Sequence, residues 1–169
     1  GVQDARPSPA ESSMRTVQAL IPLLALLLCP AVSLAADHLL ISEVAYDVPD
    51  AGEPAEYIEI LNLSQRDVYL SEVIIGSLDG FDYLNNVWLG PGEMAVYCSS
   101  TRIQTNGGIQ CNGKLPAVLG DDDWLKLEFD SLVVDEVDWG SWQTPLPGYA
   151  WELSASKQDG DLNDDETSW

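Results

Sequence analysis

The chain has 169 residues, of which 28 are Asp or Glu and 7 are Lys or Arg, so its formal net charge at pH 7 is -21. This charge argues against nucleic acid and anionic membrane surfaces as partners, because both attract clustered cationic side chains. The single histidine, His38, excludes zinc sites built from several histidines, and the 46% of hydrophobic residues is typical of a folded domain.

The first predicted element is a secretory signal peptide at residues 14–35, after an upstream segment, residues 1–13, that is not expected in the mature protein. Met14 and a cationic residue precede the apolar run Ala19–Leu28, and small residues at 33–35 suit signal peptidase. A transmembrane anchor is the alternative, but the run is shorter than the ~20 residues that span a bilayer. We therefore expect a secreted protein, extracellular or periplasmic, without a membrane span in the mature chain.

After residue 36, short segments alternate apolar and polar residues and are separated by turn residues, with no sustained helical period. Gly90-Pro91-Gly92 is a strong turn signal, and Asp130-Ser131 predicts a hairpin. This spacing predicts an all-β, antiparallel β-sandwich over residues 36–156, because two packed sheets bury both apolar faces. The predicted strands are Leu39–Tyr46, Tyr57–Asn62, Val68–Ile75 with an interruption at Ser71 and Glu72, Met94–Cys98, Trp124–Phe129, Leu132–Trp139 and the short Tyr149–Leu153.

Two cysteines, Cys98 and Cys111, remain after the predicted leader, which would take Cys29 with it. In an exported protein such a pair, separated by a polar loop rich in Gly and Asn, predicts a disulfide. Two buried free thiols are the alternative. A metal site is disfavoured because the cysteines have no histidine partners.

The order and spacing of several segments resemble the bacterial lamin tail domain over residues 38–154. These segments are LLISEVAYD, EPAEYIEILN, LGPGEMAVY, DDDWLKLEFDSLVVDEVDWG and GYAWELS. The resemblance implies an immunoglobulin-like sandwich and a non-catalytic module, found extracellularly in bacteria alone or attached to hydrolases and surface proteins. The stretch 76–86 does not align with the family pattern.

Glu59 and Asn62 lie at the centre of the family-like motif. They are three residues apart, so in a regular strand their side chains leave opposite faces, and joint ligation of an ion would need a bend. The favoured interpretation is structural: the Asn62 side chain caps the turn that follows the strand, through hydrogen bonds to the backbone.

Residues 157–169 are predicted to form an acidic tail or a truncated linker. Within this segment Asp159, Asp161, Asn163 and Asp165 occupy every second position. Oxygen ligands at such spacing favour Ca²⁺, which takes six to eight oxygens, but the EF-hand glycine and the final glutamate are missing. Calcium is thus a hypothesis beside a solvated acidic tail, and no other cofactor is predicted.

The aromatic residues Trp139, Trp142 and Tyr149 cluster near the last predicted strands and are candidates for a surface that stacks on sugars or anchors a protein. Trp142, in an irregular loop, is the best candidate for an exposed ring. Trp124 and Trp151 lie in alternating segments and are expected in the core.

Together these features predict a secreted, non-catalytic binding or adhesion module at the bacterial cell surface, with protein or carbohydrate as its partner. No glycine-rich phosphate loop, Gly-x-Ser-x-Gly or His-Glu-x-x-His motif is present in the sequence. The alternatives are the accessory domain of a longer secreted hydrolase, of nuclease, phosphatase or glycosidase type, truncated here, and a purely structural surface scaffold.

Overall fold

The computed structural model describes residues 38–46, 56–116, 119–120, 122–142 and 148–169. The predicted signal peptide and the segment before it lie outside these ranges. Within the ranges, no helix is long and apolar enough to cross a membrane.

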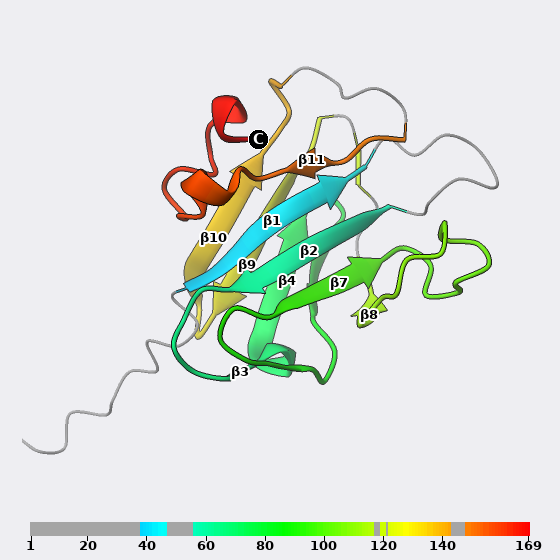
Figure 1. Ribbon diagram of the computed structural model, residues 1–169, viewed down its shortest axis with the longest axis horizontal. Helices are drawn as coiled ribbons and strands as arrows, with labels where there is room; N and C mark the ends of the chain where they lie inside the picture. The colour runs from blue at the N-terminus through cyan, green and yellow to red at the C-terminus, as the bar shows by residue number, and fades with distance from the viewer. Residues whose placement is uncertain (1–37, 47–55, 117–118, 121, 143–147) are drawn as a thin grey trace, which may run out of the picture. The chain divides into compact units, whose positions relative to one another are not determined.

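Within the described residues the strands form a five-stranded sheet, a four-stranded sheet and a two-stranded ribbon (Figure 1). In spatial order, the larger sheet holds β11 (Trp151–Glu152), β1 (Leu39–Ala45), β2 (Tyr57–Asn62), β7 (Met94–Cys98) and β8 (Gly113–Lys114). The smaller sheet holds β10 (Leu132–Asp138), β9 (Trp124–Phe129), β4 (Val73–Ser77) and β5 (Gly80–Tyr83), and the ribbon pairs β3 (Val68–Tyr69) with β6 (Trp88–Leu89). All of these pairs are antiparallel except β7 with β8.

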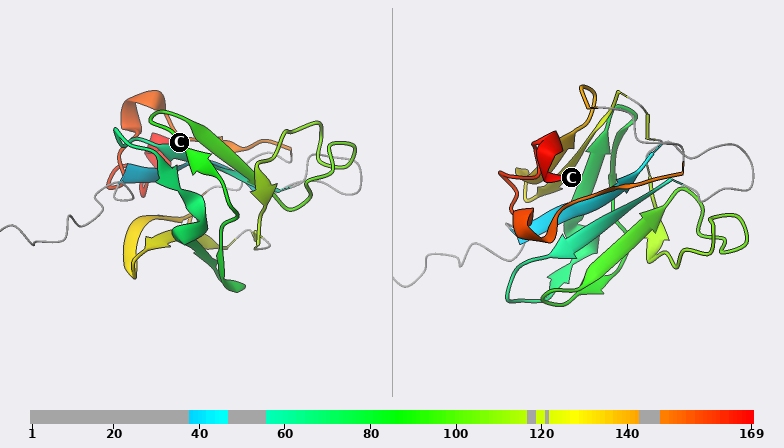
Figure 2. Two further views of the ribbon diagram at one scale, coloured as in Figure 1. Left: turned by 90° about the horizontal axis from the view of Figure 1, so that it is seen from below. Right: turned by 45° about the horizontal axis from the view of Figure 1, so that its top comes forward.

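The two sheets pack face to face, and the yellow β9–β10 hairpin lies in a different layer from the blue β1 in the left view of Figure 2. The main cluster of buried side chains is drawn from both sheets, including Ile41 and Ile58 from one, and Leu125, Leu127 and Val137 from the other. A second, smaller cluster holds Leu40, Leu61 and Leu153. Burial of such side chains stabilises a fold by roughly 1.5–3 kcal/mol each. The predicted all-β sandwich is therefore confirmed.

The predicted bounds of β2, β7 and β9 agree with the structure, but the predicted strand Val68–Ile75 is wrong as a single element. Its first two residues form β3, a 3₁₀ helix follows at Leu70–Glu72, and the chain then enters β4 in the smaller sheet. Leu70 at the start of this helix is fully buried. The polar interruption at Ser71 and Glu72 marks the place where the chain passes from the ribbon to the sheet.

The predicted hairpin around Asp130-Ser131 is present and joins β9 to β10. Both turn residues have positive φ, 51° at Asp130 and 65° at Ser131, as a two-residue type I′ turn requires. The ladder then shifts between Val133 and Asp135, where β10 carries an extra residue. This bulge turns Asp135 toward the interior, opposite Leu127.

The C-terminal segment packs on the sandwich, which corrects the expected solvated tail and the expected boundary at residue 156. Asn163 and Ser168 are buried, and the Trp169 ring contacts the core. The indole Nε1 of Trp169 donates to the Asn163 carbonyl at 2.6 Å, and the Ser154 amide donates to the Ser168 carbonyl at 2.8 Å. The backbone of this segment is therefore anchored to the fold, while its aspartate side chains remain exposed.

Candidate functional site

A pocket of about 480 Å³ opens where the beginning of β1, the middle of β10 and the C-terminal segment meet. Residues of β1 and β10 line it, together with His38 and Leu63, but the β1 residues Leu39 and Leu40 are only 2% and 1% exposed. No lysine or arginine of the described residues lines this acidic pocket. Its carboxyl groups are those of Asp135, Glu136, Asp159, Asp161 and Asp164.

Asp135 is the most deeply buried of these carboxyl groups, with 4% of the residue exposed. One of its oxygens accepts a hydrogen bond from the Ile41 amide at 2.7 Å, and the Asn163 side-chain amide donates to both oxygens at 3.0 Å. Burial raises the pKa of Asp135 from 3.8 to about 7, against the lowering effect of these hydrogen bonds, and the nearby Asp164 raises it further. Asp135 therefore changes charge near neutral pH.

The four residues of the calcium hypothesis do not converge on one point. The amide of Asn163 is directed at Asp135, while the Asp165 carboxylate accepts hydrogen bonds from the Thr167 amide and hydroxyl at 2.9 and 2.8 Å. The Asp159 carboxylate instead accepts the Asp161 amide at 3.0 Å. Among the described residues, no group of three or more His, Cys, Asp or Glu side chains is arranged to hold a metal ion, so the geometry gives calcium no support.

The predicted aromatic surface is divided between core and surface. Trp139 is buried, stacks on Tyr46 with ring centroids 5.3 Å apart, and donates from its indole to the Gly120 carbonyl at 2.7 Å. Trp142 is half-buried, with the ring of Trp151 at 5.6 Å and that of Trp169 also at 5.6 Å. Trp139 is thus a core residue, which corrects its predicted place on the surface, and Trp142 packs partly against the core instead of being a fully exposed ring.

Of the three predicted surface aromatics, Tyr149 is the one that is largely exposed, at 66%. Trp151, expected in the core, is half-buried and packs against the core cluster. Trp124, also expected in the core, is on the outer face of the smaller sheet, because its neighbour Leu125 points inward.

An exposed aromatic face on the smaller sheet was not predicted from the sequence. It consists of Phe81 and Tyr83 on β5 and Trp124 on β9, and the first two are 58% and 62% exposed. The rings of Phe81 and Trp124 lie 6.0 Å apart. The Lys126 ammonium lies over both rings, 5.1 Å from the first centroid and 5.6 Å from the second, and pairs with Glu128 at 2.7 Å.

Gly76 explains how Phe81 is held on this face. The two residues pair across β4 and β5, and a Cβ on Gly76 would overlap the Phe81 ring. The ring therefore lies over the bare backbone of β4, where it covers a glycine that would otherwise weaken the strand. The sequence signal was the alternation of Phe81 and Tyr83 within 76–86, the stretch that does not align with the family pattern.

Asn62 and Glu59, the two residues of the family-like motif, have polar partners within the fold. Asn62 is fully buried, accepts the Ser64 amide at 2.9 Å, and donates to the carbonyls of Arg66 and Leu89, each at 2.8 Å. Glu59 accepts the Ser42 hydroxyl at 2.7 Å. The turn-capping hydrogen bonds predicted for Asn62 are present, and the side chain also reaches the ribbon at Leu89.

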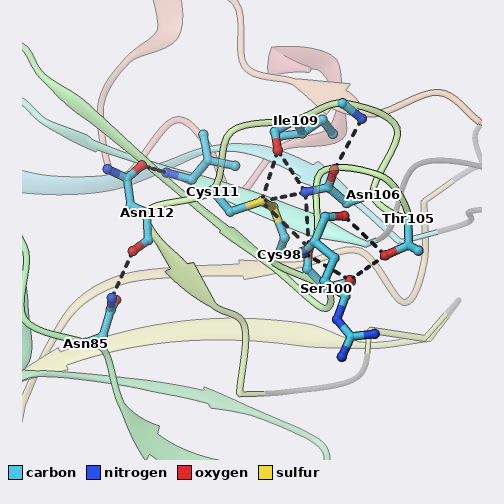
Figure 3. The surroundings of a disulfide bond; sticks show 11 residues. Asn85, Cys98, Ser100, Thr105, Asn106, Ile109, Cys111 and Asn112 are labelled. Carbon is cyan, nitrogen blue, oxygen red and sulfur yellow. Dashed lines mark hydrogen bonds between the residues drawn. A yellow bond between two sulfur atoms is a disulfide. The ribbon is translucent and has the colours of Figure 1, made fainter.

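The predicted disulfide between Cys98 and Cys111 is present, with Cα atoms 5.9 Å apart, and it closes a loop at the end of β7 (Figure 3). Asn106 fills this loop: its side-chain amide donates to the carbonyls of Ser100 at 3.2 Å and Ile109 at 2.8 Å. The polar groups of the loop thus bond to one another around the two sulfurs.

Removing the disulfide should destabilise the protein by about 3 kcal/mol, because the bond restricts a loop of this size in the unfolded chain. We expect the double variant Cys98→Ala/Cys111→Ala, measured by urea unfolding, to reproduce the loss seen when dithiothreitol is added to the natural protein. Dithiothreitol should leave the variant unchanged. Equal stability of reduced and oxidised natural protein would contradict this role.

The chain matches no protein-family model, and a search of curated proteins finds no match. A functional assignment must therefore come from the geometry of the acidic pocket and of the aromatic face. The two surfaces differ in chemistry, since one is concave and acidic and the other carries exposed rings.

Proposed function

We propose that this chain is a secreted, non-catalytic module with an immunoglobulin-like, lamin tail-like fold that binds protein or carbohydrate at the bacterial cell surface. The observation that carries the proposal is the exposed aromatic face of Phe81, Tyr83 and Trp124. Aromatic rings side by side on a surface are typical of a contact region, since they supply large apolar area at small cost in side-chain entropy.

The surroundings of Asp135 favour a binding role over a catalytic one. A carboxyl group with a pKa near 7 in a pocket is a common general acid or base. Here, however, its oxygens already accept hydrogen bonds from Ile41 and Asn163, which tie three parts of the chain together. The group is therefore better explained as a structural link than as a proton donor to a substrate.

The disulfide supports export, because such bonds form and persist in oxidising compartments. The high acidity of the chain also suits an exported binding module, since net charge favours solubility and suppresses unspecific contacts with polyanions.

The test is retention on isolated bacterial cell envelopes. We expect the double variant Phe81→Ala/Tyr83→Ala to bind at least tenfold more weakly than the natural protein, because truncation of each contact aromatic costs upward of 1–2 kcal/mol. The matched control is Trp88→Ala, which removes an equally exposed ring from the β3–β6 ribbon, 66% exposed and stacked on Tyr69.

Protease-treated and periodate-treated envelopes then separate the two partner classes: loss after protease indicates a protein, and loss after periodate indicates a carbohydrate. All variants are first compared by circular dichroism and melting temperature, so that misfolding is not mistaken for lost binding. No retention of the natural protein, or equal loss in the Trp88→Ala control, would contradict the proposal.

A further inference from the structure

We propose that β5, the outer strand of the smaller sheet, binds an extended peptide segment of a protein partner, which joins the sheet as a further antiparallel strand. This inference rests on the proposed function, because the peptide would contact the same aromatic face, and it names protein as the partner. It is carried by the open edge of β5, by the direction of its backbone groups and by the chemistry of its two faces.

The edge of β5 is open within the described part of the chain. The strand lies at one end of the order β10-β9-β4-β5 and pairs there with β4 alone. All of its residues, Gly80–Tyr83, are exposed. Proteins commonly protect such an edge with proline, lysine or a bulge. β5 contains neither proline nor lysine, and its register with β4 is regular.

The backbone groups of Phe81 and Tyr83 point away from β4. The Leu84 amide donates to the Val73 carbonyl at 3.0 Å, and in an antiparallel pair the bonded positions alternate, so the next one is Asp82. Phe81 and Tyr83 occupy the other positions and therefore face the open edge. The Tyr83 amide is bonded to the Asp82 carboxylate at 2.8 Å. The Phe81 amide and the two carbonyls are thus the groups that an added strand would bond.

The two faces of β5 indicate which side chains the partner carries. Phe81 and Tyr83 are on the outer face, where apolar side chains of an added strand would lie opposite the exposed rings. Asp82 is on the other face, beside a hollow of about 120 Å³ that no lysine or arginine of the described residues lines. A lysine opposite Asp82 complements its charge. The edge therefore favours a segment in which apolar and basic residues alternate.

A second copy of this chain fits the edge poorly. In an antiparallel β5–β5 pair about a two-fold axis, the two Asp82 side chains would lie opposite or diagonal to each other on one face. Like charges at such positions destabilise a pair of strands, and each copy carries a formal net charge of -21. The inferred partner is therefore a different protein.

The probe is the peptide acetyl-Lys-Val-Lys-Val-Lys-Val-Lys-amide, titrated into the natural protein at 150 mM NaCl and pH 7.5 by isothermal titration calorimetry. With its valines opposite Phe81 and Tyr83 in an antiparallel pair, the valine amides bond to β5 and the lysine amides point away. N-methylation of the three valines should weaken binding about tenfold, because it removes these donors. N-methylation of three lysines should weaken it less than about twofold. The two modified peptides carry the same charge, so they control for general attraction to an acidic protein.

Hydrogen exchange of the Phe81 amide gives a second readout and should slow about tenfold when the peptide saturates the protein. A pair of variants tests the same backbone group. Phe81→Ala and Phe81→Pro both lose the ring, but only Phe81→Pro also loses the outward amide, at an edge position that tolerates proline. We expect Phe81→Pro to bind the peptide more weakly than Phe81→Ala, once melting temperatures show that both are folded.

Equal binding of the two methylated peptides, or a greater loss on lysine methylation, would overturn the proposal. Unchanged exchange at Phe81, or no binding of the unmodified peptide, would also overturn it. These outcomes are distinct from failure of the proposed function. Envelope retention that requires Phe81 and Tyr83, yet is equal for Phe81→Ala and Phe81→Pro, would keep the adhesive role and exclude strand addition.

Discussion

Replacing Asp135 with Asn should stabilise the protein at pH 8 and remove most of the pH dependence of its stability between pH 5 and pH 8. The folded-state pKa of Asp135 is raised to about 7, above the ordinary 3.8 expected in the unfolded chain. Between these values the folded protein keeps a proton that the unfolded chain releases, so the free energy of unfolding falls as pH rises. At 1.36 kcal/mol per pKa unit, the difference between the two pKa values corresponds to about 4 kcal/mol of stability. More than half of this stability is lost above pH 5.

The amide introduced by Asp135→Asn fits the site. Its oxygen can accept the Ile41 amide. If the Asn163 amide turns over, the new NH₂ group can donate to the Asn163 Oδ1 atom, which has no hydrogen-bond partner among the described residues. The variant thus keeps the links between β1, β10 and the C-terminal segment while it removes the buried charge.

The measurement is urea unfolding of the natural protein and the variant at pH 5, 6, 7 and 8. The other titratable groups facing the pocket, His38, Glu136, Asp159, Asp161 and Asp164, remain in both proteins, so the difference between the two curves belongs to Asp135. The control is Asp130→Asn, which removes one negative charge at an exposed position. Its free energy of unfolding should vary with pH in parallel with that of the natural protein. The raised pKa of Asp135 would be contradicted if the Asp135→Asn variant were less stable than the natural protein at pH 8. It would also be contradicted if the free energy of unfolding of the variant changed as steeply with pH.

The alternation of apolar and polar residues was sufficient to predict most strands, because one face of each sheet is buried. It was not sufficient to place Asp135. In a regular hairpin from the Asp130-Ser131 turn, Asp135 would lie opposite Lys126 on the outer face, as a natural ion pair. The extra residue at the bulge instead places it opposite Leu127, inside. Residue alternation does not reveal such a shift, so the acidic pocket could not be predicted.

The C-terminal segment was misjudged for a related reason. Its aspartates indicated either calcium or a solvated tail, since both interpretations use only local spacing. Its position depends on partners distant in sequence: Asn163 bonds to Asp135 on β10, and Trp169 packs against Trp142. The aromatic face was missed because Phe81 needs the bare backbone of Gly76 beneath it. Both features come from tertiary contacts rather than from local pattern.

The capping role of Asn62 was predicted correctly, because the turn that it caps is adjacent in the sequence. Its additional contact with the distant Leu89 appears only in the folded structure. One side chain satisfies the Ser64 amide and the Arg66 carbonyl within the turn after β2, and also the Leu89 carbonyl on β6. Asn62 therefore joins the larger sheet to the β3–β6 ribbon as well as capping the turn.

Substituting Asn62→Ala should destabilise the protein by about 4 kcal/mol, because the buried Ser64 amide and Leu89 carbonyl lose their side-chain partner at about 1–3 kcal/mol each. The Arg66 carbonyl still accepts the Ser64 hydroxyl. The matched control is Asn85→Ala, an exposed asparagine whose amide donates to one carbonyl, that of Asn112, at 2.9 Å. It should cost under about 1 kcal/mol, since water can replace a partner at an exposed site. Urea unfolding at pH 6 measures both. If the two variants lose equal stability, Asn62 does not join the sheet to the ribbon, and the turn after β2 must be held by its backbone alone.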